Sequence, residues 1–552
     1  MICILHGYLL DGSGSNLWTR SVVQSLCREG ETVHLVCQEP HPEIFDFISE
    51  AHRYHADGAV ETLFRREVPY KGRAVMHKPQ VGDLLPVYVW DRYEEFSNVS
   101  PMIELNDAAI NLYLDRNTDA LMRIVRERRI TSMHVNHTVL LSVAAERVSR
   151  AASIPFAIMP HGSDIEYAVK KDERFLRMAS DAMSRASRVY VIGREMRERV
   201  NKVFGSVPCI DAKLMELNLG ADTSLFEPVA VRQRPAKINN LLKLLEDAPR
   251  GKSFELSETM TNRLNRDMTL EELREAARGA ANYSNKLPDE DIESKLRRVD
   301  WVGDKIIFFL GRIIASKGLQ TIVAALPLIL ERHPNAKLIV TGHGPLREPL
   351  EAMLWALRNG HRALVERIAR CGSALEGSGL EGAAAKEFKE VRHFFDRLEL
   401  DAELDDYFEK AERYLTSDSV IFTGYLTHRE LRYLFPCCDI AIFPSIVAEA
   451  GPLVFLEALA SGCFPLGTYF AGMAASINSV RKVLPPEDAE LMKLSADETQ
   501  TVEDISVKAS EALLISNKHK EALRRVAVEQ YDWKNVARRL ASDLKSLAVA
   551  RS

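Results

Sequence analysis

Short apolar runs alternate with longer amphipathic stretches along the first 225 residues. The runs that predict strands are ICILHG, TVHLVCQ, TSMHVN, PFAIMPHG, RVYVIG and KLMELNLG. Stretches between them, such as SNLWTRSVVQSLCREG and VLLSVAAERVSRAA, have the periodicity of helices. Strands that alternate with helices predict a parallel, doubly wound sheet.

The same alternation starts again near residue 305. The apolar runs KIIFFLGR, AKLIVTG, SVIFTG, DIAIFPS and FPLGTYF predict strands, and GLQTIVAALPLILERHP, THRELRYLFPCCD and GPLVFLEALASG predict helices. Thr427 and Glu430 form the sequence signature of a capping box. We therefore expect two Rossmann-like α/β domains that face each other across a cleft, with ligands at the carboxyl ends of the strands.

Two helix-prone segments interrupt this pattern. Residues 229–300 are polar, with a second capping box at Thr269 and Glu272, and residues 347–418 are rich in Ala, Glu, Arg and Leu. The predicted organisation is an N-terminal domain over 1–228, a helical insertion or linker over 229–300, and a C-terminal domain over 301–530 that contains the insertion 347–418. For these insertions, inert decoration or self-association into a homo-oligomer is the default interpretation, and a lid is the alternative.

Composition and charge narrow the class of protein. The 552 residues exceed what one hydrophobic core supports, and a net charge of −6 argues against a nucleic-acid partner. No apolar run approaches the ~20 residues of a transmembrane helix. The apolar start MICILHGYLL lacks the basic segment of a signal peptide and predicts a first strand. Eight scattered cysteines show no zinc spacing, so we expect a cytoplasmic protein with reduced thiols and no metal site.

The most specific motif is PSIVAEAGPLVFLEALASG, in which two carboxylates stand eight positions apart. Glu449 falls in a strand-to-helix loop, and Pro452 suits the first position of the helix. The N–H groups of Leu453 and Val454 would then attract a phosphate. Glu457 lies nearly two turns into the helix, where it could accept hydrogen bonds from a diol such as ribose. Acidic residues are also common near helix starts, so the pair alone is weak support.

A second motif, FLGRIIASKGLQ, places Arg312 and Lys317 directly after a predicted strand. Two cations in such a loop suit a diphosphate leaving group, whose negative charge grows as the bond to it breaks. The alternative is an ordinary solvated loop.

The motifs GRIIASKGL, VTGHGP, FTGYLTHREL and PSIVAEAGPLVFLEALASG, in this order, resemble the retaining glycosyltransferases of family 4. The resemblance covers almost the whole chain apart from the two insertions. It implies the GT-B fold and transfer of a hexose from a nucleoside-diphosphate sugar to an acceptor hydroxyl, with retention of configuration. The nucleotide-sugar is a co-substrate, and neither a cofactor nor a catalytic metal is expected.

The resemblance also assigns roles to residues of the C-terminal half. It implies that Glu449 touches the hydroxyls of the donor sugar and that Glu457 binds the ribose. Arg312 and Lys317 would hold the diphosphate, and the segment around Tyr425 would form the nucleobase wall, largely through backbone atoms.

In the N-terminal half, DGSGSNLWTRSVVQSL resembles the glycine-rich loop of the same family. Gly12 and Gly14 would let the backbone approach a phosphate and the acceptor closely. The string HGS resembles the family's position for a histidine beside the reacting sugar, which implies His161; His137 is a second candidate for the cleft wall. The C-terminal helix at 531–552 would pack back on the N-terminal domain.

The acceptor, a small molecule or a glycan, stays open. Lys170, Lys171 and Arg174 would suit a small anionic acceptor, although an ordinary charged helix face explains them equally well. Pro452 stands where many family members have glycine, so the donor's identity is not transferred, and UDP, GDP and ADP remain open. Two rival functions are a GT-B phosphorylase or epimerase, for which no motif is present, and a catalytically silent binding protein, against which the intact Glu and Arg/Lys pairs argue.

Overall fold

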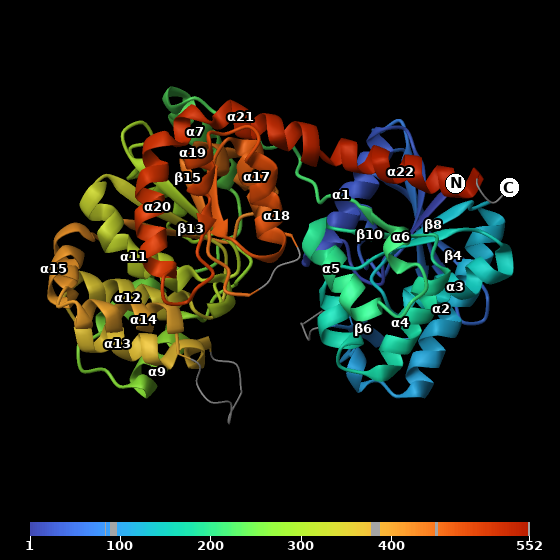
Figure 1. The fold of residues 1–552 in the computed structure, drawn as a ribbon, viewed down its shortest axis with the longest axis horizontal. Helices are drawn as coiled ribbons and strands as arrows, with labels where there is room; N and C mark the ends of the chain where they lie inside the picture. Colours follow the sequence, from blue (N-terminus) through green and yellow to red (C-terminus); the bar gives the residue numbers. More distant parts are fainter. Residues whose placement is uncertain (83, 89–95, 377–386, 448–450, 550–552) are drawn as a thin grey trace. The chain divides into compact units, whose positions relative to one another are not determined.

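The computed structural model describes residues 1–82, 84–88, 96–376, 387–447 and 451–549. The chain divides into two compact units (Figure 1). Unit 1 consists of Met1–Ala221 with Glu529–Ser552, and unit 2 consists of Asp222–Val528, so both helical insertions belong to unit 2. No helix among the described residues is long and apolar enough to cross a membrane.

Unit 1 is built on a sheet that, over the described ranges, has nine strands in the order β11-β10-β9-β8-β1-β2-β5-β3-β4. They are β1 (Ile2–Leu5), β2 (Thr32–Val36), β3 (Ile48–Tyr54), β4 (Val60–Arg65), β5 (Arg73–Pro79), β8 (Ser132–Asn136), β9 (Phe156–Met159), β10 (Arg188–Val191) and β11 (Leu214–Glu216), while β6 (Leu84–Val87) and β7 (Asn98–Pro101) pair separately. The six strands predicted for this half are all present, and they pair in parallel.

One edge of this sheet differs from the all-parallel prediction. β4 runs antiparallel to β3, and the two strands are joined by residues 55–59. So short a connection can join only antiparallel strands, and its Asp57-Gly58 pair is typical of a hairpin because Gly58 adopts a φ of +86°. The hairpin and β5 come from a segment with weaker alternation, which the apolar runs did not predict.

Helices cover the sheet of unit 1, and the C-terminal helix is one of them. They are α1 (Gly14–Arg28), α2 (Asp107–Glu127), α3 (Leu141–Ala152), α4 (Glu173–Arg185), α5 (Gly193–Phe204), α6 (Ile210–Lys213) and α22 (Trp533–Val549). α22 buries Leu540 and Leu544 and packs along α1. At its solvent face Lys545 pairs with Glu31 at 2.5 Å. Chain ends that are far apart in sequence therefore share one core.

Unit 2 contains, in its described part, a six-stranded parallel sheet in the order β14-β13-β12-β15-β16-β17. Its strands are β12 (Lys305–Leu310), β13 (Ala336–Thr341), β14 (Val420–Gly424), β15 (Ile440–Phe443), β16 (Phe464–Thr468) and β17 (Lys493–Leu494). The helices that alternate with these strands are α11 (Leu319–Arg332), α16 (His428–Leu434), α17 (Leu453–Ser461), α18 (Ala471–Val480), α19 (Pro486–Glu490), α20 (Thr501–Ile515) and α21 (Lys520–Val526). The five strands predicted here are present, and both capping boxes form.

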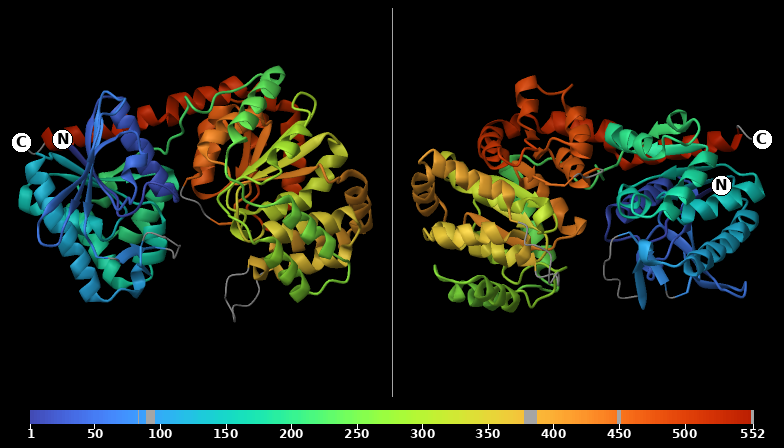
Figure 2. Two further views of the ribbon diagram at one scale, coloured as in Figure 1. Left: turned by 180° about the vertical axis from the view of Figure 1, so that it is seen from behind. Right: turned by 60° about the horizontal axis from the view of Figure 1, so that its bottom comes forward.

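The two insertions are helical. They supply α7 (Arg234–Leu245), α8 (Phe254–Arg263), α9 (Leu270–Ala280), α10 (Ile292–Arg297), α12 (Arg347–Arg358), α13 (Arg362–Cys371), α14 (Lys389–Leu400) and α15 (Leu404–Tyr414). Helices α9 and α12 to α14 gather on one side of unit 2 in both figures (Figures 1 and 2). The insertions thus pack on each other as well as on the domain that carries them.

A buried ion-pair network ties the two insertions to each other. The guanidinium of Arg347 donates to both oxygens of Asp289, at 2.7 and 2.5 Å, and both side chains are almost fully buried. Lys252 pairs with Glu348 at 2.9 Å and with Glu351 at 2.7 Å. Burial alone would raise the pKa of Asp289, but Arg347 and Lys295 lower it below its usual value. Asp289 therefore stays ionised in the interior.

Replacing Arg347 by methionine should lower the free energy of unfolding by about 3–5 kcal/mol, because it leaves the buried carboxylate of Asp289 without its principal partner. Arg358→Met, on the same helix, is the control, since none of the described contacts gives Arg358 an ion pair. Urea unfolding followed by circular dichroism measures both variants. Equal losses in the two variants would contradict this assignment.

Candidate functional site

Four loops of unit 2 leave their strands at the same edge of the sheet and are bonded to one another. Ile313, after β12, donates its N–H to His343 O, after β13, at 2.7 Å. Gly342 N donates to Gly424 O, at the end of β14, at 2.9 Å, and Ile446 N, after β15, donates to Ser316 O at 2.9 Å. The parallel topology brings the ends of β12 to β15 together, so the predicted motifs of this half converge in space.

Glycines make this convergence sterically feasible. A Cβ on Gly342 would lie 1.8 Å from Gly311 O, and one on Gly344 would lie 2.3 Å from Ile313 O. A Cβ on Gly318 would lie 2.0 Å from Pro444 O, and Gly318 also has a φ of +76°. No side chain fits at these positions, because real Cβ atoms do not approach other atoms so closely. The loops are therefore held backbone against backbone.

The two predicted cations lie on the loop between β12 and α11. Arg312 lies two residues after the end of the strand and is exposed, and Lys317 ends a short 3₁₀ turn at Ala315–Lys317. Gly318, in the left-handed conformation, is the N-cap of α11. The geometry presents both cations on one loop beside the loops after β13 and β15.

The helix α17 begins one residue later than predicted. Pro452 is its N-cap, with extended backbone, and Leu453 is its first residue. Leu453 and Val454 occupy the first turn, whose N–H groups have no acceptor within the helix. Glu449, the residue expected to touch the donor sugar, lies outside the described residues.

Glu457 is buried and paired with a histidine that the sequence analysis missed. His428 Nε2 donates to Glu457 Oε1 at 2.8 Å, and the carboxylate is 6% exposed. His428 is the first residue of α16 and packs edge-on against Phe226. The sequence feature that could have pointed to His428 is its position, directly after the capping residue Thr427. The pair fixes the direction of the carboxylate predicted to bind ribose.

The first insertion shapes the loop predicted as the nucleobase wall. Tyr425 N donates to Leu287 O at 3.0 Å, Asp289 N donates to Thr423 O at 2.9 Å, and Pro288 bridges to Gly424 as an antiparallel strand would. A pocket of about 350 Å³ lies beside Tyr425 and is lined in part by residues 243–245, 247–249 and 286–288 of the insertion. This insertion thus takes part in building the loop.

In unit 1, histidines gather at the carboxyl edge of the sheet. The rings of His137 and His161, after β8 and β9, have centroids 4.8 Å apart. His161 Nε2 donates to Asn136 Oδ1 at 2.8 Å, and His6, after β1, stacks on His137 at 6.1 Å. The structure brings together both histidines proposed from the sequence.

Asp164 fixes the two loops that carry these histidines. Its carboxylate accepts hydrogen bonds from Thr138 N at 2.8 Å and from His161 N at 3.1 Å. His137 itself adopts a φ of +73°, which is uncommon for a residue with a Cβ, and both of its ring nitrogens are buried without a hydrogen-bond partner among the described residues. Asp164 is a positioning residue that the sequence analysis did not single out.

Burial keeps these histidines uncharged. Desolvation lowers the pKa of His161 to about 3, with His6 and His134 adding to the effect, and it lowers the pKa of His137 well below its usual value. Because the Nε2 proton of His161 bonds to Asn136, Nδ1 is the nitrogen left to accept a hydrogen bond. A neutral imidazole of this kind suits a sugar hydroxyl.

The glycine-rich loop lies at the same edge. Gly12 has a φ of +106°, α1 begins at Gly14, and a Cβ on Gly14 would meet no described atom within 4 Å. Glu39, after β2, accepts from Leu10 N at 2.9 Å and so holds the start of the loop. The loop leaves room for a ligand to approach its backbone.

The basic residues proposed for the acceptor are already engaged. Lys170 pairs with Glu166 at 2.6 Å, and Arg174 pairs with Asp172 and Asp107, both at 2.7 Å. Lys171 is exposed. Their charge is thus largely balanced locally. Among the residues that the structure describes, no group of three or more His, Cys, Asp or Glu side chains could hold a metal ion.

Comparisons of sequence find similarity to glycosyltransferases. Residues 291–365 and 401–499 match the family model described as glycosyl transferases group 1. An uncharacterised glycosyltransferase of Methanocaldococcus jannaschii is 23% identical over 237 residues, which is 43% of this chain and 43% of that protein. The chain therefore matches less than half the length of this curated relative. The family match places a glycosyl transferase group 1 segment within unit 2.

Comparisons with solved structures support the assignment of the fold. A sucrose-phosphate synthase from Thermosynechococcus elongatus superposes with a TM-score of 0.51 at 15% identity, over 100% of this chain and 99% of that one. The HepE protein of Anabaena, solved in complex with UDP, gives a TM-score of 0.51 at 13% identity, over 99% and 100%. The chain has the GT-B fold of two Rossmann-like α/β domains.

The buried histidines predict an acid-sensitive unit 1. The folded pKa values of His6 and His134, about 4, and of His161, about 3, lie below the unfolded value near 6.5. The stability that each contributes is fully present above pH 6.5 and is lost as the pH falls toward the folded value, at up to about 1.4 kcal/mol per pH unit for each histidine.

Urea unfolding at pH 7, 6 and 5 should show this decline in the free energy of unfolding. His134→Leu should reduce the slope of the decline by about the contribution of one titrating group. His41→Gln, at an exposed histidine, should leave the slope unchanged. A slope that both variants leave unaltered would rule out the buried imidazoles as its cause.

Proposed function

We propose that this protein is a glycosyltransferase that moves a hexose from a nucleoside-diphosphate sugar to an acceptor hydroxyl, with retention of configuration and without a catalytic metal, in the manner of family 4. The observation that carries the proposal is the convergence in unit 2 of the cationic loop at Arg312 and Lys317, the N-terminus of α17 and the paired Glu457. The sequence match to group 1 glycosyl transferases covers the same loops.

Each part has a role in this reaction. Arg312, Lys317 and the N–H groups of Leu453 and Val454 would stabilise the charge that develops on the departing diphosphate. Glu457, held by His428, would accept hydrogen bonds from both ribose hydroxyls, because an ionised carboxylate offers two acceptor oxygens. The loop at Tyr425 would contact the base. Glu449 would contact the donor sugar.

Unit 1 would present the acceptor and part of the donor sugar. His161, neutral and oriented by Asn136, would accept a hydrogen bond from a sugar hydroxyl through Nδ1. Gly12, Gly14 and His137 would border the acceptor. In a retaining transfer the acceptor hydroxyl attacks on the face that the diphosphate leaves, and its proton passes to a leaving phosphate oxygen.

Nucleotide binding is the first test of the donor site. The chain should gain thermal stability with one of UDP, GDP or ADP, without added metal, because a ligand that binds only the folded state raises the melting temperature. UDP is the first to try, since the structurally similar Anabaena protein was solved with it. Glu457→Gln should weaken binding at least about tenfold, because an amide has only one acceptor oxygen.

Glu487→Gln, on the exposed surface of α19, is the matched control and should bind as the unaltered protein does. No stabilisation by any nucleotide at millimolar concentration would refute the donor site. So would equal binding by the two variants.

Turnover tests the electrostatic role of the cationic loop. Lys317→Ala should lower kcat by about 100-fold or more while changing KM less, because the charge on the diphosphate grows toward the transition state. Lys305→Ala, at the opposite end of β12, should leave kcat within about twofold. Release of nucleoside diphosphate from the donor, by transfer or by hydrolysis, gives the rate. Near-normal kcat in Lys317→Ala would overturn the account.

A further inference from the structure

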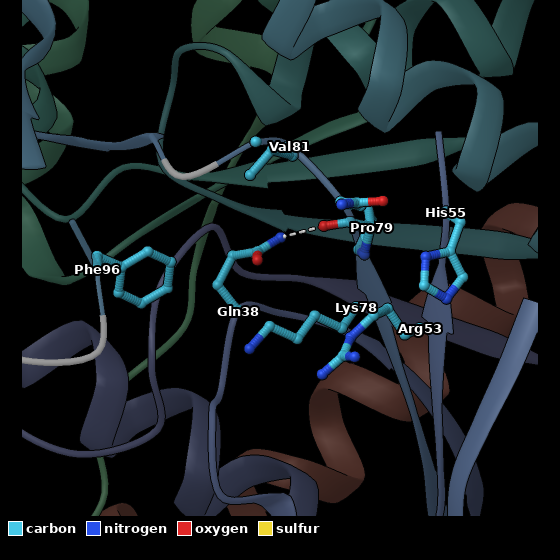
Figure 3. A pocket seen from close by; sticks show the side chains of 9 residues that line it. Gln38, Arg53, His55, Lys78, Pro79, Val81 and Phe96 are labelled. Carbon is cyan, nitrogen blue, oxygen red and sulfur yellow. Dashed lines mark hydrogen bonds between the residues drawn. The ribbon is translucent and has the colours of Figure 1, made fainter. Parts of the chain in front are cut away.

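Hydrogen bonds from side chains to distant backbone groups fix strand ends and loops in both units. Unit 1 has a pocket of about 240 Å³ in which Gln38 Nε2 donates to Pro79 O at 3.0 Å, so the segment after β2 is tied to the end of β5 (Figure 3). In unit 2, a carboxylate oxygen of Glu376 accepts a hydrogen bond from Ala315 N at 2.6 Å. Ala315 lies in the middle of the cationic loop, residues 312–317.

Glu376 belongs to the second insertion and lies in a turn that the first insertion contacts. It is the last residue of the short 3₁₀ helix η6 (Gly372–Glu376), which follows α13. Arg274, on α9 of the first insertion, donates from Nη2 to Ala374 O in this turn at 3.3 Å. Both insertions therefore contribute to the position of the Glu376 carboxylate.

Two neighbouring loops hold the cationic loop on either side of Ala315. Ile313 bonds to the loop after β13 and Ser316 bonds to the loop after β15, through backbone hydrogen bonds of 2.7 and 2.9 Å. Ala315 is the first residue of a 3₁₀ turn, so its N–H has no acceptor within that turn. Glu376 supplies this acceptor, while Gln320 Nε2 donates to the carbonyl of Ala315 at 2.9 Å. The bond to Glu376 thus fixes the segment between the two cations.

The hydrogen bond between Glu376 and Ala315 is of a strong kind. Hydrogen bonds to carboxylates are shorter and stronger than those between neutral groups. Both residues are partly buried, so water competes with the bond only in part. A loop held in this way need not reorganise when charge develops on a diphosphate, and such preorganisation is what gives an electrostatic group its effect on the rate.

We propose that Glu376 is a positioning residue, whose bond to Ala315 holds the cationic loop in the geometry that stabilises the departing diphosphate. The proposal rests on the glycosyltransferase function proposed above. It gives the second insertion a part in the reaction, beyond the decoration or self-association expected from the sequence.

Turnover of two variants tests the bond. UDP-glucose, GDP-mannose and ADP-glucose are the donor probes, and the one that raises the melting temperature of the unaltered protein is used. Glu376→Ala should lower kcat by about 10- to 100-fold and change KM less, because a small displacement of the loop weakens mainly the contacts made in the transition state. Glu376→Gln should keep kcat within about threefold of the unaltered protein, since an amide oxygen still accepts from Ala315 N.

Glu409→Ala is the matched control and should have the kcat of the unaltered protein. Glu409 is exposed on α15 of the same insertion and takes part in none of the described hydrogen bonds or ion pairs. All values of kcat are expressed per nucleotide-binding site, counted by titration with the nucleoside diphosphate. Molecules that have failed to fold therefore do not lower the measured kcat.

Three results would overturn the positioning role. They are a normal kcat in Glu376→Ala, an equal loss of kcat in Glu376→Ala and Glu376→Gln, and tighter nucleotide binding in both, which would mean that the carboxylate competes with the diphosphate. Failure of the glycosyltransferase function is seen separately, because the unaltered protein would then bind none of the nucleotides, and this result would overturn both proposals.

Discussion

Parallel pairing constrains every candidate residue of this protein, because it directs the carboxyl ends of neighbouring strands to one edge of each sheet. In unit 2 the loops after β12, β13, β14 and β15 must share that edge, and they fit only where Cβ atoms are missing, at Gly318, Gly342 and Gly344. The close backbone contact fixes the loops that bear Arg312 and Lys317. A rigid cationic loop can stabilise a developing charge without the cost of reorganising during the reaction.

Buried charges also stabilise the segments that lie beside this edge of the sheet in unit 2. The ion pair between Arg347 and Asp289 joins the two insertions, and the neighbouring bridge between Pro288 and Gly424 joins the first insertion to β14 through the backbone. Breaking such a pair costs far more than an exposed pair would, because the remaining charge has no water to solvate it. The first insertion therefore contributes to the position of Tyr425. It is more than an inert decoration of the domain.

The sheet of unit 1 also directs the carboxyl ends of its parallel strands to one edge, but there neutral histidines gather. Desolvation lowers the pKa of His161 and His137, and Asp164 holds the loops on which they lie. The result is an uncharged edge at His161 that suits hydroxyl groups.

The sequence by itself determined the two α/β domains, the eleven strands with clear apolar runs and both capping boxes, because periodicity and capping are local properties. It also determined the motifs of the cationic loop and of α17. The tertiary structure alone decided the place of β5 between β2 and β3 and the pairing of His428 with Glu457. These depend on which distant segments meet, and no local pattern encodes the register of strands that are separated in sequence.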